Sequence, residues 1–209
     1  MAISTTTPKS IMTTVIANEM QIVPKVSTMT YIGEIVETTH PVRLFYAAWV
    51  DMEIDDDLYI ENKEKKRTKK GKFIKSFGNQ LTIKSRTKNF NVKLFYNNRV
   101  QITGVKSETD VRNIIDKLCN VFDFKIINEK MVMKNVSIKI SQTTLNLYNM
   151  YDKLSLEGKF VSYTPEIYPG LKLKTGKSTA LIFATGNVII STKNDSEINQ
   201  IVNTLMKAK

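Results

Sequence analysis

The sequence predicts an α+β fold in which one strand–strand–helix unit occurs twice. Residues 91–120 and residues 178–208 carry the same apolar pattern. In each copy, apolar residues alternate along two segments with the two-residue period of a half-buried sheet. They then recur at three- and four-residue spacing, as on one face of a helix. Because an internal repeat determines the whole architecture, both halves of the chain are predicted to share one design.

Composition limits the class of protein. The chain has 209 residues, 42% of them apolar, which suits one large domain or two half-domains that share a core. Its formal net charge of +11 favours an anionic partner such as nucleic acid or an acidic membrane surface. A single cysteine, Cys119, excludes an internal disulfide framework. Neither a membrane-spanning run nor a secretory signal is visible, so we expect a soluble protein that is intracellular and not secreted.

The N-terminal part is predicted to begin with a strand over residues 10–23. Pro24 suits the first turn of a helix, and an approximate helical stripe follows it. That stripe consists of Val26, Met29, Tyr31, Ile32 and Ile35.

A charge reversal follows, from the acidic residues 51–64 to the basic residues 65–75. Such a run is typical of a solvated loop, and a phosphate-contacting arm is the functional alternative. The number of residues that separates equivalent positions of the two halves is larger at their N-terminal strands than at their hairpins. We therefore expect an insertion near residues 38–74, with repeats over residues 1–123 and 124–209.

Turn and cap residues delimit the repeated units. A strand is expected from Phe77. Asn97-Asn98 and Gly186-Asn187 suit tight hairpin turns. Ser107 with Asp110, and Asn194 with Glu197, have the spacing of helix N-caps and their acidic partners. Between the copies we predict a strand over residues 124–140, an amphipathic helix over 143–154, and a turn at Pro169-Gly170.

Alternation assigns the two faces of each hairpin. The packed face is predicted to hold Val92, Leu94, Val100 and Ile102 in the first copy, and Ala180, Ile182, Val188 and Ile190 in the second. The opposite face presents Lys93, Phe95, Gln101 and Thr103, then Leu181, Phe183, Ile189 and Ser191. An exposed apolar face of this kind usually binds a partner; the alternative is a second layer that covers it.

Three stretches carry a family resemblance. Residues 163–173 (YTPEIYPGLKL), followed by residues 178–190 (STALIFATGNVII), resemble the C-terminal half of the TATA-box-binding protein family. Residues 93–113 (KLFYNNRVQITGVKSETDVRN) resemble the corresponding part of the N-terminal half. The resemblance covers nearly the whole chain outside the insertion. The chain is small and rich in lysine, asparagine and isoleucine, and in this it also resembles the family's homologues in large DNA viruses. That resemblance implies a location in the nucleus or in a cytoplasmic viral factory.

The resemblance implies a pseudo-twofold saddle: a curved antiparallel sheet with helices on its convex face. Its concave face would bind the minor groove of A·T-rich promoter DNA and kink the duplex with apolar wedges. The implied function is transcription initiation with recruitment of a B-type general transcription factor and the RNA polymerase machinery. No enzyme activity and no cofactor are implied.

Site residues follow from the resemblance position by position. The four wedges fall at Phe77, Phe95, Tyr168 and Phe183, where Tyr168 replaces a phenylalanine. The central asparagine positions fall at Ser10 and Asn135, and the groove-centre hydroxyls at Thr103 and Ser191. Leu181 and Ile189 match the apolar floor. Phosphate contacts fall at Arg99, Lys106, Lys174 and Lys193. The B-type factor would dock on Glu166 and Ile167, while Thr164 replaces an acidic residue.

Two rival functions remain open. Lys93, Gln101, Ser10 and Tyr168 depart from the family pattern, as in a saddle that serves only as a protein-interaction module and has lost sequence-specific DNA binding. An enzyme is the other rival, but His40 lacks metal-ligand neighbours and the TGK run at 175–177 lacks the rest of a phosphate loop. Asp55, Asp56 and Asp57 suit a charged loop better than a cation site. Cys119 suits a small residue at the edge of the core.

Overall fold

Antiparallel hairpins dominate the computed structural model, which describes residues 15–17, 20–36, 54–61 and 79–209. Two compact units are present. The N-terminal unit is Val26–Lys134. The C-terminal unit combines Asn135–Lys209 with the described residues up to Lys25. The repeat boundary predicted after residue 123 stays a prediction, because a repeat is defined by sequence and a compact unit by contacts.

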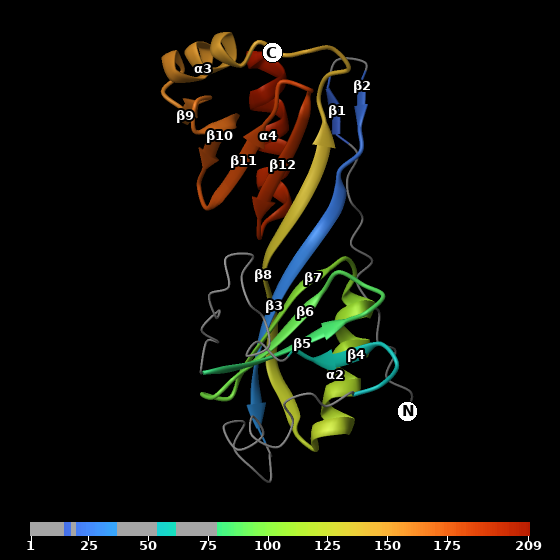
Figure 1. Ribbon diagram of the computed structural model, residues 1–209. Helices are drawn as coiled ribbons and strands as arrows, with labels where there is room; N and C mark the ends of the chain where they lie inside the picture. The colour runs from blue at the N-terminus through green and yellow to red at the C-terminus, as the bar shows by residue number, and fades with distance from the viewer. Residues whose placement is uncertain (1–14, 18–19, 37–53, 62–78) are drawn as a thin grey trace, which may run out of the picture. The chain divides into compact units, whose positions relative to one another are not determined.

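The N-terminal unit is a sheet in the order β4-β5-β6-β7-β3-β8 with one described helix (Figure 1). Its strands are β3 (Lys25–Val36), β4 (Leu58–Ile60), β5 (Gln80–Ser85), β6 (Asn91–Phe95) and β7 (Arg99–Val105), and its helix is α2 (Glu108–Phe122). Strand β8 (Lys125–Lys139) contributes its residues 125–134 here and its residues 135–139 to the C-terminal unit.

The C-terminal unit has the strand order β9-β10-β11-β12-β8, which corresponds to β4-β5-β6-β7-β3 of the N-terminal unit. Its strands are β9 (Phe160–Thr164), β10 (Tyr168–Thr175), β11 (Ser178–Ile182) and β12 (Asn187–Thr192), and its helices are α3 (Leu147–Leu156) and α4 (Asp195–Ala208). A separate hairpin of β1 (Val15–Ala17) and β2 (Met20–Ile22) belongs to the same unit. The α+β class and the large antiparallel sheet are therefore confirmed.

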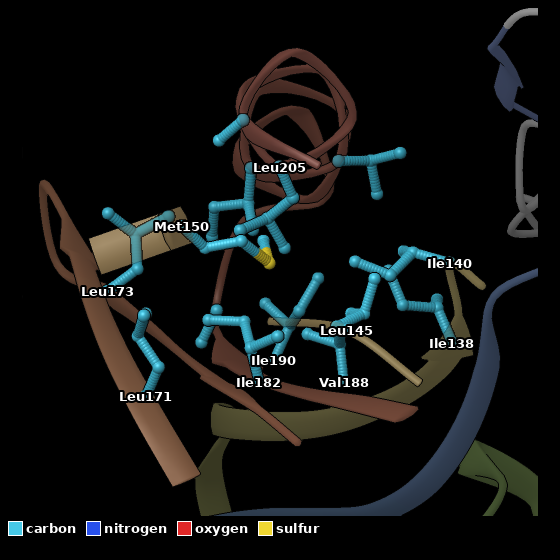
Figure 2. Packing of buried hydrophobic residues seen from close by; sticks show 14 of the residues in the cluster. Ile138, Ile140, Leu145, Met150, Leu171, Leu173, Ile182, Val188, Ile190 and Leu205 are labelled. Carbon is cyan, nitrogen blue, oxygen red and sulfur yellow. The ribbon is translucent and has the colours of Figure 1, made fainter. Parts of the chain in front are cut away.

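Each unit has one core between its helices and one face of its sheet. The packed-face residues predicted in both hairpins are buried, and none is more than 2% exposed. Helix α2 covers the first set with Val111, Ile114 and Leu118. In the C-terminal unit, Figure 2 shows Leu205 of α4 and Met150 of α3 directed toward the strand residues. The predicted division of each hairpin into a packed face and an opposite face is thus confirmed.

The predicted turns and caps are largely present. Asn98 has φ 60° and Gly186 has φ 81°, the left-handed conformation that a tight hairpin turn requires. Ser107 Oγ accepts a hydrogen bond from Asp110 N at 3.1 Å and caps α2. Asn194 caps α4 through Ser196 N, but Glu197 instead accepts a hydrogen bond from Ser178 Oγ. The acidic residue therefore joins helix to sheet rather than closing a capping box.

The helix predicted after Pro24 is wrong, since residues 25–36 form the long strand β3. Met29 and Ile35 are buried in the core and Tyr31 packs against it, whereas Ile32 lies on the other side of the strand. A register shift between Met29 and Thr30 breaks the strict two-residue alternation. The apolar residues before and after this irregularity therefore imitate helical spacing.

Three other segments refine the predictions. Residues 15–22 include two short paired strands in place of one strand. The turn expected at Pro169-Gly170 lies at residues 165–167, and Pro169 and Gly170 belong to β10 at a register shift. Within the expected insertion, β4 pairs with β5 and buries Leu58 and Ile60, which places it at the sheet edge that β9 occupies in the other unit. Most of residues 38–74 lie outside the described residues.

Adjacent residues of β11 provide a test of the two-faced sheet. Ile182 is fully buried, so we expect Ile182→Ala to lower the free energy of unfolding by about 2–5 kcal/mol. Leu181→Ala, on the opposite face, should lower it by less than about 1 kcal/mol. Urea denaturation of both variants measures the difference. Equal losses would mean that a second layer buries the face that holds Leu181.

Candidate nucleic-acid interface

Each sheet has a face that the described helices do not cover, which we call its open face. The C-terminal open face comprises Asn135, Lys172, Lys174, Leu181, Phe183, Ile189 and Ser191. The N-terminal open face comprises Lys93, Phe95, Gln101 and Thr103. These side chains alternate along their strands with the fully buried core residues.

The centre of the C-terminal open face is apolar. Leu181 of β11 lies in register with Ile189 of β12, and both side chains are half-buried. Lys172 of β10 lies opposite Leu181 on the other side, so a cation adjoins the apolar pair. The two residues predicted to form the apolar floor therefore lie side by side on this face.

Two aromatic rings stand at one end of this face. Tyr168 and Phe183 are in contact, with ring centroids 6.1 Å apart and planes at 62°. Both rings lie against Gly170: a Cβ at this position would be 2.7 Å from Tyr168 Cε1 and 3.2 Å from Phe183 Cε1. Glycine is needed here because any side chain would displace a ring. The structure thus brings together two of the four predicted wedge residues.

The remaining predicted wedges are in the other half of the sequence. Phe95 ends β6, is half-buried, and lines a depression of about 500 Å³ on the N-terminal open face. Phe77 lies outside the described residues.

Hydroxyl and amide groups occupy the predicted central positions. Ser191 Oγ donates a hydrogen bond to Asn135 Oδ1 at 2.6 Å, so each of these side chains fixes the orientation of the other. In the N-terminal unit, Thr103 lies opposite Thr30 of β3, and its Oγ1 donates to Asn91 O at 3.4 Å. Ser10, the predicted partner position, lies outside the described residues. Thr30 lies opposite Thr103 because residues 25–36, where the sequence pattern predicts a helix, form the strand β3 that pairs with β7.

The predicted phosphate contacts are all exposed. Arg99 begins β7, Lys106 follows it, Lys174 lies in β10 and Lys193 follows β12. Strand pairing places two residues that were not predicted beside lysines of this face. Phe160 of β9 is 81% exposed and lies in register with Lys174, and Ser162 lies in register with Lys172. Lys172 was not among the predicted residues either. The alternation of β10 could have placed it on the open face, because Leu171 and Leu173 on either side of it are fully buried.

The predicted partner-docking residues lie in the turn between β9 and β10. Glu166 is exposed and Ile167 is 84% exposed. Ile167 N donates a hydrogen bond to Thr164 O at 3.0 Å, so the turn has a defined backbone while its side chains face outward. An exposed isoleucine beside a carboxylate is a reasonable protein-contact pair.

The acidic cluster is structural. Asp57 Oδ1 accepts hydrogen bonds from Ser85 Oγ at 2.7 Å and Thr87 Oγ1 at 2.7 Å, and also from the backbone amides of Arg86 and Thr87. Asp55 Oδ2 receives Lys117 Nζ at 2.6 Å, which ties this turn to α2. Among the residues that the structure describes, no group of three or more His, Cys, Asp or Glu could hold a metal ion.

The remaining chemical candidates have structural roles or lie outside the described ranges. Burial raises the pKa of the Cys119 thiol, which disfavours the reactive thiolate. The TGK run at 175–177 forms the turn between β10 and β11, where Gly176 has φ 56°. His40 lies outside the described residues. No helix in the described ranges is long and apolar enough to cross a bilayer.

Sequence comparisons point to one family. Residues 130–208 match the family model described as transcription factor TFIID (or TATA-binding protein, TBP). A TATA-box-binding protein of Picrophilus torridus is 33% identical over 123 residues, and one of Thermoplasma volcanium is 34% identical over 122 residues. In both cases the match covers 53% of this chain and 64% of the relative, so the chain spans less than two thirds of these relatives.

A solved structure shares the fold. Methanococcus jannaschii TBP aligns with a TM-score of 0.58 at 19% sequence identity, over 88% of this chain and 98% of that chain. At this identity the similarity concerns the fold alone.

The pH dependence of stability tests the role of Asp57. Burial alone would raise the pKa of Asp57, but hydrogen bonds from Ser85, Thr87 and Arg86 outweigh it and lower the pKa from 3.8 to about 2. Because the folded-state pKa lies below the unfolded-state value, the stabilisation is complete above about pH 4 and is lost as the pH falls toward about 2.

We therefore expect Asp57→Ala to lower the free energy of unfolding by about 1–3 kcal/mol at neutral pH. The difference from the unaltered protein should shrink between about pH 4 and pH 2. Urea denaturation across this range measures it, with Asp56→Ala as control because Asp56 is exposed. A difference that stays constant down to pH 2 would rule out the hydrogen-bonded carboxylate as its source.

Proposed function

Because the matched domain and these relatives support a divergent member of the TATA-box-binding protein family, we propose that this chain is a non-enzymatic transcription initiation factor. It binds the minor groove of A·T-rich promoter DNA through the open faces of its sheets. The observation that carries this proposal is the C-terminal open face, where an apolar pair adjoins two contacting aromatic rings and a row of lysines.

Each part of that face has a use in the minor groove. An A·T pair presents only acceptors there, whereas a G·C pair adds the guanine 2-amino donor. The apolar side chains of Leu181 and Ile189 offer that donor no acceptor, so they favour A·T pairs. Tyr168 and Phe183 are placed to wedge into a base step and kink the duplex. Lys172, Lys174 and Lys193 are available for phosphates, and Arg99 and Lys106 serve the same role on the N-terminal unit.

The C-terminal unit makes the larger contribution to minor-groove binding in this proposal. Lys93 and Gln101 stand in the N-terminal unit where Leu181 and Ile189 stand in the other. Burying an ammonium group against base edges costs several kcal/mol unless it finds acceptors.

The same two residues favour one alternative function. A saddle that had lost sequence-specific DNA binding would keep its core and exchange its apolar floor for polar residues. The N-terminal open face has that character, so a protein-interaction module in transcription is the second candidate.

Partner recruitment is proposed for the turn between β9 and β10. Glu166 and Ile167 would contact the B-type general transcription factor, which links the promoter complex to the RNA polymerase machinery. The setting would be intracellular, in the nucleus or in a cytoplasmic viral factory.

Fluorescence anisotropy over a salt series tests DNA binding. We expect tighter binding to an A·T-rich TATA duplex than to a G·C duplex of equal length. The logarithm of affinity should fall with the logarithm of salt by roughly 0.9 for each neutralised phosphate. Equal affinity for both duplexes at every salt concentration would leave only charge attraction and favour the interaction module.

The wedge assignment is tested in the same system. Phe183→Ala should abolish duplex bending, measured by energy transfer between the duplex ends, and should leave the melting temperature within a few degrees because Phe183 is outside the buried core. The matched control is Phe122→Ala, which removes an aromatic ring that is buried in the other unit. A large loss of stability in Phe183→Ala would reassign this ring to the core.

A charge reversal tests the docking turn. Glu166→Arg should weaken binding of the cognate B-type factor to the protein–DNA complex at least tenfold, since it places a like or unmatched charge at a protein contact. Binding of the variant to DNA alone is the control and should be unchanged. Undiminished recruitment of the factor in a titration of the complex would show that this turn is not its docking site.

A further inference from the structure

A polar pair on the N-terminal open face replaces the apolar pair of the C-terminal one at the same register. Lys93 of β6 pairs with Gln101 of β7, just as Leu181 of β11 pairs with Ile189 of β12. The flanking core residues are equally buried in both units. The two open faces therefore offer the same geometry with different hydrogen-bonding chemistry.

The polar pair has unused hydrogen-bonding groups among the described residues. Both side chains are half-buried, and neither has a hydrogen-bond or ion-pair partner among the described residues. Gln101 lines the depression of about 500 Å³ that Phe95 also lines. Glu34 lies in the same depression and accepts a hydrogen bond from Asn128 Nδ2 at 3.2 Å. The depression that Phe95 lines is therefore also lined by the acceptor oxygens of Glu34 and Gln101 and by two cations, Arg99 and Lys130.

The minor-groove edges of the base pairs decide what such a pair can recognise. Every base pair presents acceptors at purine N3 and pyrimidine O2, to which Lys93 can donate. Only a G·C pair also presents a donor, the guanine 2-amino group. The amide oxygen of Gln101 can accept from that group, whereas an A·T pair leaves the oxygen without a base partner. Isoleucine and leucine have no such acceptor.

We propose that Gln101 accepts a hydrogen bond from a guanine 2-amino group, so that the N-terminal open face selects a G·C pair within an otherwise A·T-rich site. Lys93 donates to the neighbouring acceptor of the same or the next pair, which satisfies the ammonium group that would otherwise be buried without a partner. This inference rests on the proposed minor-groove function. It predicts a recognition site whose two halves differ in base preference.

Inosine separates this hydrogen bond from every other property of the base pair. Inosine lacks the 2-amino group of guanine but still pairs with cytosine. A series of A·T-rich TATA duplexes would each carry one G·C pair, moved through the site position by position. A second series would carry inosine in place of guanine at the same positions. Anisotropy gives the affinity of the full-length protein for each duplex.

We expect a guanine duplex to bind about fivefold to tenfold more tightly than its inosine counterpart at one or two positions in one half of the site. In the other half, guanine should bind less tightly than inosine, because Leu181 and Ile189 leave its amino group unpaired. Gln101→Ile, which installs the residue type of the other unit, should abolish the guanine preference. Ile189→Gln is the reciprocal variant and should create one in the other half. Thermal melting of both variants verifies folding.

Equal binding of guanine and inosine at every position would overturn this inference while leaving A·T-selective binding intact. A guanine preference that persists in Gln101→Ile would also overturn it, since another group would then be the acceptor. If no duplex in either series binds more tightly than a fully G·C duplex, the proposed function fails and this inference fails with it.

Discussion

Both units depend on one constraint, the burial of a single face of a twisted antiparallel sheet. Successive side chains of a strand point to opposite faces, so the residues that close the core fix which residues remain open. The hairpins of β6–β7 and β11–β12 meet this constraint with almost interchangeable core residues. Their open faces are not constrained in that way, and there the two units differ. Because the core residues are similar and the open-face residues differ, the same fold carries an apolar surface in one unit and a polar surface in the other.

Much of the fold could be predicted because the packed positions repeat. Val92, Leu94, Ala180 and Ile182 have no role but packing, and their period identified both hairpins. Strand β3 could not be recognised, since its irregularity at Met29 disguised the two-residue period as a helical one. Pro169 and Gly170 misled for a different reason. They are typical turn residues, but here they mark a register shift inside β10, and the chain reverses just before them.

The candidate site was predictable where it lies on the repeated hairpins. Alternation alone placed Leu181, Ile189 and Ser191 on the open face, and the family resemblance supplied their predicted roles. Strand neighbours outside the hairpins needed the structure, because pairing between distant segments leaves no local pattern. Thr30 opposite Thr103, Phe160 beside Lys174, and the hydrogen bond between Ser191 and Asn135 are of this kind. Sequence spacing cannot show which of two β-branched or polar segments lies next to a given strand.

Gly170 has a consequence for how this face can change. Tyr168 and Phe183 both rest against its bare Cα, and against each other. Neither ring can shift without altering the support of the other, so the two aromatic residues form one energetically coupled element. Substitutions at the two positions will therefore not be additive in their effects. A Phe-to-Tyr exchange keeps the ring and is therefore tolerated at these positions. Loss of one ring, or replacement of Gly170, removes the support of the remaining ring and is tolerated less readily.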